Sequence, residues 1–142
     1  MGKILKKGKV VILLSGRHAG KKAIIVKTFE EGTKKQKFPC ALVAGMREGP
    51  RRVTRSMGKK KTEKNVSKIK PFIKFVNYNH IMPTRYTVSD IDLRTHVTPA
   101  NMTKLDKNEE SRKEIKKLFE GRYLQRGKNT SGVQYFFHKL RF

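Results

Sequence analysis

The sequence is poor in acidic residues, in cysteine and in long apolar runs. Only 11 of its 142 residues are Asp or Glu, against 35 Lys or Arg, so the formal net charge is +24. The single cysteine, Cys40, excludes an intrachain disulfide and any zinc site that needs several thiolates. The longest apolar run, Val10 to Leu14, is far shorter than the ~20 residues that cross a bilayer. Residues 1–7 also lack the apolar stretch of a signal peptide, so we expect no membrane association.

Patterns of catalytic or metal-ligating residues are also missing. The histidines show no metal-ligand spacing. Asp90 and Asp92 have no nearby group that completes a catalytic set, and we interpret them as turn-forming or arginine-pairing residues. The glycine-bounded turn at residues 16–22 lacks the glycine spacing and the Lys-Ser/Thr pair of a Walker loop. We therefore expect a protein that is not an enzyme and has no cofactor, metal ion or small-molecule substrate.

Basic residues are in excess, and they are distributed unevenly. Residues 1–89 carry 23 Lys+Arg and four acids, a net charge of +19, whereas residues 90–142 carry 12 and seven, a net charge of +5. A small folded domain with this charge repels itself, and a polyanion relieves the repulsion with release of counterions. Nucleic acid is therefore the expected partner, and an anionic membrane surface is the main rival.

The densest basic stretch runs from Arg47 to Lys74 and contains only two acidic residues. Gly49-Pro50 and Gly58 interrupt any long helix or strand there. We expect a basic loop over residues 47–70 that becomes ordered mainly against phosphates. Its candidate RNA-binding residues are Arg47, Arg51, Arg52, Arg55, Lys59, Lys60, Lys61, Lys64, Lys68 and Lys70.

The first half of the chain has the pattern of a β-protein. Short runs rich in β-branched residues, separated by Gly-containing turns, are typical of strands. The predicted strands cover residues 9–14, 23–27, 39–44, 52–54 and 72–76. Such a set indicates a small antiparallel barrel or sandwich.

The turn between the first two predicted strands is the sharpest local feature. Gly16 and Gly20 bound it, and Gly20 is a predicted left-handed position because glycine adopts a positive φ without steric penalty. Phosphate contact and a tight hairpin with solvated charges are both compatible with its spacing. The candidate RNA-binding residues of the turn are Arg17, His18, Lys21 and Lys22, with His18 either stacked on a base or simply exposed.

One helix is predicted in the second half. Asn108 is suited to its N-cap, and Gly121 is suited to its end. Ile115, Leu118 and Phe119 form one apolar stripe, which we expect to pack on the barrel. Residues 133–137 are expected to form a final strand or an extended tail.

Two further segments are candidates for RNA contact. Residues 77–86 mix aromatic, amide and basic side chains that can stack on splayed bases, or they form a polar crossover loop. The candidates there are Tyr78, Asn79, His80, Arg85 and Tyr86. The aromatic-basic tail, with candidates Lys139 and Arg141, either packs back on the domain or inserts into RNA or a neighbouring protein.

Residues 8–26 resemble a KOW motif, in which two strands flank a loop with a fixed glycine, here Gly20. Together with residues 41–45, 57–61, 67–70, 77–86 and 136–142, they resemble the eukaryote-specific family of large-subunit ribosomal proteins numbered twenty-seven. The resemblance is dense over residues 1–88 and the last seven residues. It is loose over residues 90–135, where the loop around 126–133 is longer and Tyr135 stands where the family has a tryptophan.

The resemblance implies a mostly β protein with some α-structure. Residues 1–89 would form a small SH3-like antiparallel barrel with the basic loop, and residues 90–142 a helical extension packed on it. It also implies a structural constituent of the cytosolic 60S subunit, with nucleolar passage during assembly. The implied partners are large-subunit rRNA and neighbouring ribosomal proteins. The alternative is a transcription or RNA-processing factor with a KOW domain, a class that usually carries several domains.

Overall fold

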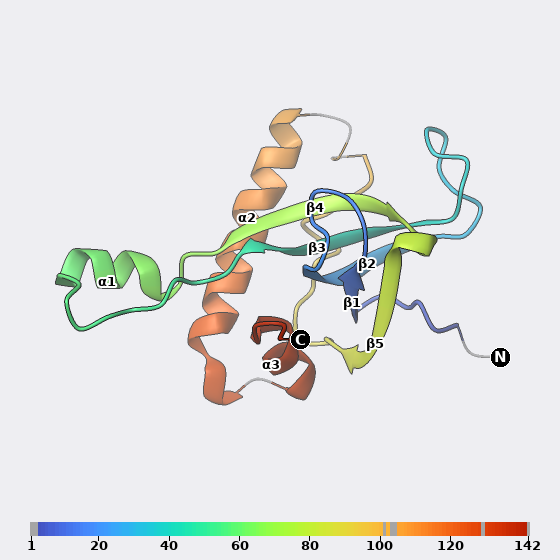
Figure 1. Cartoon of the computed structure of the whole chain (residues 1–142). Helices are drawn as coiled ribbons and strands as arrows, with labels where there is room; N and C mark the ends of the chain where they lie inside the picture. The colour runs from blue at the N-terminus through green and yellow to red at the C-terminus, as the bar shows by residue number, and fades with distance from the viewer. Residues whose placement is uncertain (1–2, 101, 103–104, 129, 142) are drawn as a thin grey trace.

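The structure is a computed structural model and describes residues 3–100, 102, 105–128 and 130–141. Its centre is one antiparallel sheet of five strands in the order β4-β3-β2-β1-β5 (Figure 1). The strands are β1 (Lys9–Leu13), β2 (Lys22–Phe29), β3 (Cys40–Glu48), β4 (Lys70–Asn77) and β5 (Ile81–Thr87). The helices are α1 (Lys59–Val66), α2 (Leu105–Leu124) and α3 (Ser131–Phe137), with short 3-10 helices η1 (Tyr78–His80) and η3 (Arg126–Lys128).

The sheet is strongly curled. Strands β4 and β5 are its opposite edges, yet only the three residues of η1 separate them. With about 4.8 Å between neighbouring strands, the edges of a flat sheet would be roughly 19 Å apart. The four peptide units from Asn77 to Ile81 extend to at most about 14 Å, and to less in a 3-10 helix. The two edges therefore approach each other at this end of the sheet.

The curl does not close a barrel. Among the described residues, β1 pairs with β2 and β5, and β3 pairs with β2 and β4, but no ladder joins β4 to β5. The predicted antiparallel sheet with added helices is thus confirmed. The predicted closed SH3-like barrel is not confirmed.

Alternate residues of the strands supply two separate apolar clusters. The concave face is filled by the sheet's own side chains, with Leu5 and, from η1, Tyr78 packed against them: Val11, Leu13, Ala23, Ile25, Ala41, Val43, Phe72, Val76 and Ile81. The other face packs against residues 88–97, α2 and α3. Cys40 is fully buried in β3, as expected for a small apolar residue. Both faces of the sheet are therefore closed to solvent over most of their area.

Helix α2 covers the second face with the predicted stripe. Ile115 and Phe119 are fully buried, and Leu118 packs beside them. The helix is longer than predicted, because Asn108 lies inside it and the chain continues through Gly121 to Leu124. Glycine permits a helix end but does not require one. Of the helices in the described part of the chain, none combines the length and the apolar composition that a bilayer span requires.

Three other local predictions are wrong. Residues 52–54 form no strand, and residues 133–137 belong to a helix, α3, rather than to a strand or extended tail. Val133 and Phe136 are both buried, a spacing that suits a helix face. Residues 81–87 form strand β5 rather than a crossover loop.

A buried lysine fixes α3 to the sheet. The Lys22 side chain, 7% exposed, donates hydrogen bonds of 2.7 Å to the carbonyl oxygens of Tyr135 and His138. These carbonyls lie at the C-terminal end of α3, where the helix dipole favours a cation. The ammonium also lies 3.9 Å from the centre of the Tyr135 ring, which stacks on Tyr86 of β5 at 4.1 Å.

A substitution at Gly132 tests the docking of α3 on the sheet. A Cβ at this position would overlap the carbonyl of Thr87, whereas a Cβ at Gly121 of α2 would meet nothing within 4 Å. Alanine normally stabilises a helix by about 0.5–1 kcal/mol relative to glycine. We expect G121A to raise the free energy of unfolding by this amount and G132A to lower it, both measured by urea denaturation. Equal stabilisation by the two substitutions would contradict the contact between α3 and β5.

Candidate nucleic-acid interface

The turn between β1 and β2 has the predicted backbone geometry. Gly16 and Gly20 have φ of +88° and +73°, the left-handed region that favours glycine. The Gly20 N–H donates to the carbonyl of Leu13 at 2.7 Å and closes the turn. The turn folds over β4, where the His18 ring stacks on Phe72 with 4.0 Å between centroids and 6° between planes. One face of the His18 ring is therefore covered by the protein itself.

Basic side chains from three segments gather around His18. Burial lowers the pKa of His18, and the charges of Lys74, Arg17, Arg47 and Lys21 lower it further. We call these five residues the turn cluster. A pKa lowered by neighbouring cations shows that the positive potential is concentrated here. The fold thus joins predicted residues of the turn to Arg47 of β3.

Lys74 is the member of the turn cluster that was not among the candidate residues. It lies in β4 between the inward-facing Ile73 and the half-buried Phe75, and its side chain is exposed. Its Nζ is the nearest heavy atom to a Cβ placed on Gly16. Strand alternation places Lys74 on the same face as Phe72 and Val76 of the concave cluster, and only the fold shows that the turn lies beside its exposed side chain.

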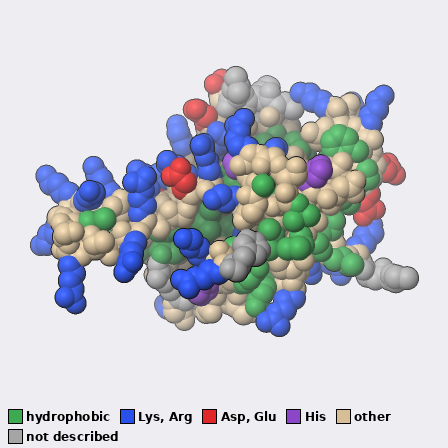
Figure 2. Space-filling model, in the orientation of Figure 1, with side chains coloured by type: hydrophobic (Ala, Val, Ile, Leu, Met, Phe, Trp, Pro, Cys, Tyr) green, Lys and Arg blue, Asp and Glu red, His purple; other side chains and the backbone are tan. Residues whose placement is uncertain are grey.

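Residues 49–69 form an extension that we call the basic arm, with α1 in its middle. It stands away from the sheet at the left of Figure 1, and Lys and Arg side chains project from it in Figure 2. Local contacts organise it, because Thr62 donates to the carbonyl of Met57 and the Asn65 amide lies 3.7 Å from the Met57 sulfur. The seven basic side chains of the arm from Arg52 to Lys68 are exposed: Arg52, Arg55, Lys59, Lys60, Lys61, Lys64 and Lys68.

The expected basic loop is therefore partly helical. Gly49-Pro50 and Gly58 lie outside α1, and Gly58 is its N-cap residue. These glycines and the proline do not prevent the helix, since the Lys and Glu residues that follow Gly58 are good helix formers. At the base of the arm, Lys70 pairs with Glu48 at 2.8 Å, and this contact with Lys70 lowers the pKa of Glu48.

Lys22 does not belong to the exposed basic surface. It was a candidate phosphate ligand, but its ammonium is buried against α3, and burial lowers its pKa. Its neighbour Lys21 precedes the strand and is exposed. In β2, Lys22 faces the same side as Ile24 and Val26, which pack in the core cluster of the helix-covered face. The alternation of the strand was the available signal for this difference.

The candidates in residues 77–86 divide into two groups. Tyr78 packs against the concave cluster, and burial raises its pKa, while Asn79 and His80 in η1 are exposed. In β5, exposed Arg85 donates to the Tyr86 hydroxyl at 2.9 Å, and the Tyr86 ring is stacked on Tyr135. The segment is therefore not one continuous platform of free aromatic rings.

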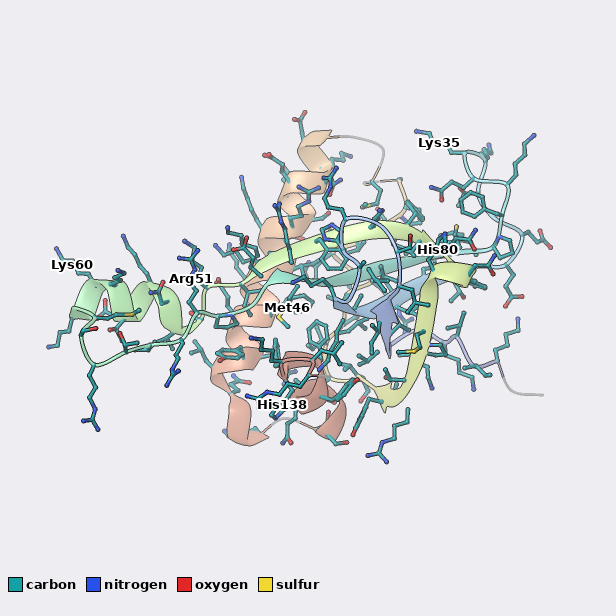
Figure 3. All side chains as sticks on the ribbon, in the orientation of Figure 1. Lys35, Met46, Arg51, Lys60, His80 and His138 are labelled. Atoms are coloured by element: carbon teal, nitrogen blue, oxygen red, sulfur yellow. The ribbon has the colours of Figure 1, made fainter. Side chains whose placement is uncertain are left out.

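The tail packs back on the domain, one of the two expected alternatives. Lys139 and Arg141 are exposed, and residues 136–140 border a pocket of about 660 Å³ that we call the tail pocket. The rest of it is lined by residues 20–22 at the start of β2, by residues 46–51 at the end of β3 and just beyond it, and by Tyr123 of α2. Figure 3 labels Met46 and Arg51, which come from one lining segment of this pocket, and His138, which comes from another. Phe142 lies outside the described residues.

The described residues contain no group of three or more His, Cys, Asp or Glu side chains that could hold a metal ion. Asp92 accepts a hydrogen bond from the Arg94 N–H at 3.0 Å, and the carbonyl of Asp90 accepts one from the Arg122 guanidinium at 2.7 Å. The Asp92 contact agrees with the expected turn-forming role, whereas the Arg122 contact is made to the backbone of Asp90 rather than to its carboxylate. The chemistry of the exposed surface is that of Lys and Arg side chains, which bind anionic oxygens.

Comparison with known proteins identifies the family of the chain that carries this basic surface. Residues 10–142 match the model of the ribosomal L27e protein family. The chain is 49% identical to the large ribosomal subunit protein eL27B of Saccharomyces cerevisiae and to eL27 of Pisum sativum, and 48% identical to eL27 of Tetrahymena thermophila. Each alignment covers 100% of this chain and of the relative. The chain therefore belongs to the ribosomal L27e protein family, a family of structural components of the large ribosomal subunit rather than of enzymes.

Proposed function

We propose that this protein stabilises the rRNA of the large subunit by contacts from its basic surface to RNA phosphates. The proposed partners are rRNA and neighbouring ribosomal proteins. The proposed location is the cytoplasmic ribosome, reached after assembly in the nucleolus. The KOW-like hairpin of β1 and β2 would present the turn cluster to the RNA.

The turn cluster is the observation that carries this proposal. Four cations from the turn, β3 and β4 lie close enough to His18 to lower its pKa. The fold holds like charges together here, which is unfavourable unless an anion neutralises them. Phosphate oxygens bind Lys and Arg through strong charge-assisted hydrogen bonds.

The basic arm has a different proposed role. Four of its lysines, Lys59, Lys60, Lys61 and Lys64, lie on α1, a short helix that stands away from the sheet. Phosphate contacts position a protein on the RNA backbone and carry little sequence preference. The turn cluster, η1 and Arg85 would make the local contacts that depend on the shape of the RNA.

Replacing three arm lysines should weaken RNA binding without unfolding the protein. We expect the variant K59S/K60S/K61S to lower the slope of log K against log salt by about 2–3, since each lost phosphate contact removes about 0.7–0.9. The measurement is binding to large-subunit rRNA fragments at several salt concentrations, followed by sedimentation of the tagged chain with 60S particles in cells. K113S/K116S/K117S, on the exposed face of α2, is the charge-matched control.

The proposed function predicts that the unaltered chain sediments with 60S particles. Recovery only in low-mass fractions would favour the transcription or RNA-processing alternative. An equal loss of slope in the arm variant and the α2 control would show that binding follows net charge and that the arm has no special role.

Lys21 and Lys22 should differ in effect although they are adjacent. K21M removes an exposed cation, so we expect weaker RNA binding and an unchanged free energy of unfolding. K22M leaves the partly buried carbonyls of Tyr135 and His138 without this donor, so we expect a free energy of unfolding lower by about 1–2 kcal/mol. Urea denaturation and RNA titration of both variants measure the two quantities. A stability loss confined to K21M would contradict the anchoring role of Lys22.

RNA binding should raise the pKa of His18. Phosphates would neutralise the four cations that help to lower this pKa in the free protein, so the imidazolium becomes more favourable. Because the bound state then takes up protons, affinity should increase as the pH falls through the His18 midpoints. An NMR titration of the His18 ring with and without RNA measures the shift, and K74M should raise the midpoint of the free protein. An unchanged midpoint in saturated complex would exclude phosphates from the turn cluster.

A further inference from the structure

The tail pocket combines features that the phosphate-binding surface elsewhere lacks. Its volume is about 660 Å³, within the usual range for sites that enclose a small ligand. Its walls come from three distant segments, residues 20–22, 46–51 and 136–140, with Tyr123 of α2. The pocket therefore exists only when α3 is docked on the sheet.

Aromatic rings line the interior of the tail pocket. Tyr123 and Phe137 are partly exposed, and their rings meet edge to face with 5.5 Å between centroids. Behind them, Phe136 is fully buried and fixes Phe137 through a tilted ring contact at 5.2 Å. Partly exposed rings held in place by a core are stacking surfaces for a nucleobase.

Cations surround the opening of the same pocket. The exposed basic residues that line it are Lys21, Arg47, Arg51 and Lys139. Its one acidic residue, Glu48, pairs with Lys70 at 2.8 Å, and Lys22 is engaged by two backbone carbonyls. The remaining rim charge is positive, which complements a phosphate on each side of a bound base.

We propose that the tail pocket takes one unpaired nucleotide of the RNA, with its base against Tyr123 and Phe137 and its phosphates on the basic rim. The proposal rests on the proposed RNA-binding function. A base inside a duplex is stacked on both faces, so only a bulged or single-stranded nucleotide can enter. The tail pocket would then make the protein prefer irregular RNA over a continuous duplex.

A second groove shows why the rings matter. It has a volume of about 700 Å³ and lies between residues 3–7, β2 and residues 94–99. Lysines and Arg94 border it, but its apolar lining is aliphatic and includes Leu5, Val26 and Val97. Both sites are thus bordered by positive charge. Of the two, the tail pocket alone has aromatic stacking surfaces.

The test compares two RNA hairpins that differ only by one bulged uridine. We expect the full-length protein to bind the bulged hairpin more tightly than the paired one at about 0.1 M salt. Y123L should weaken binding to the bulged hairpin by about tenfold, the scale of one lost base–aromatic stack, and leave binding to the paired hairpin unchanged. Y123F should retain the preference, and urea denaturation verifies that both variants are folded.

A second variant blocks the pocket without changing its rings. Gly49 lines the pocket, and a Cβ there would meet nothing within 4 Å, so G49L adds bulk in open space. It should remove the preference for the bulge in the same way as Y123L. A 4-thiouridine at the bulge should crosslink to the peptides that contain Tyr123 or Phe137.

Three outcomes are distinguishable. Loss of the bulge preference in Y123L and G49L, with paired binding intact, supports the nucleotide pocket. Equal affinity of the unaltered protein for both hairpins, or crosslinks confined to the basic arm, overturns the pocket and leaves phosphate binding in place. Failure to bind either hairpin at any salt concentration overturns the proposed RNA-binding function itself.

Discussion

The three-residue connection between β4 and β5 is the constraint on which the rest of the structure depends. It brings the two edges of a five-strand sheet together at one end, so the sheet curls around its own side chains. The concave face then needs no helix to cover it. One face remains for residues 88–97, α2 and α3, and a single chain of 142 residues suffices to bury both faces.

The same constraint separates the apolar interior from the basic surface. With both faces of the sheet used for packing, most charged side chains lie on turns, strand ends, the arm and the exposed face of α2, and Lys74 and Arg85 are exposed within edge strands. Lys22 is the exception, because its ammonium is buried. Desolvation of this charge is unfavourable, and the two carbonyls at the end of α3 offset the cost. This contact places the tail beside the turn, so the tail pocket depends on a cation that itself has no access to a ligand.

Much of the sheet could be predicted from the sequence, because its central strands are continuous apolar runs. Residues 10–13, 23–26 and 40–45 are buried on both faces, and β-branched residues are frequent in the first two runs. The positive φ of Gly20 and the buried stripe of Ile115 and Phe119 could also be predicted, because each depends on a short stretch of sequence. Strand β5 was missed because it is an edge strand in which Ile81 alone is buried, so it has almost no apolar alternation.

The rest of the candidate site depends on tertiary neighbours. Helix α3 contains Gly132, Tyr135 and Phe136, whose propensities suit a strand or loop as well as a helix, and packing against Thr87 and Lys22 decides between them. Similarly, Arg47 and Lys74 are 27 positions apart in the sequence, and only the pairing of β3 with β4 brings them to the same turn. Basic composition predicts an anionic partner but cannot show which cations act together.

The turn cluster and the basic arm differ in how much they are organised before a ligand binds. The cluster residues come from packed strands and a closed turn, so binding there orders few additional degrees of freedom. Ile69 anchors the end of the arm in the core and donates its N–H to Glu120. Contacts of Thr62 and Asn65 with Met57 organise the middle of the arm. The long, exposed lysine side chains of the arm lose more conformational entropy on binding. Its charge still acts at a distance and accelerates encounter with a polyanion. Under the proposed function, the arm would therefore speed the encounter with RNA, and the turn cluster would then fix the position of the protein on it.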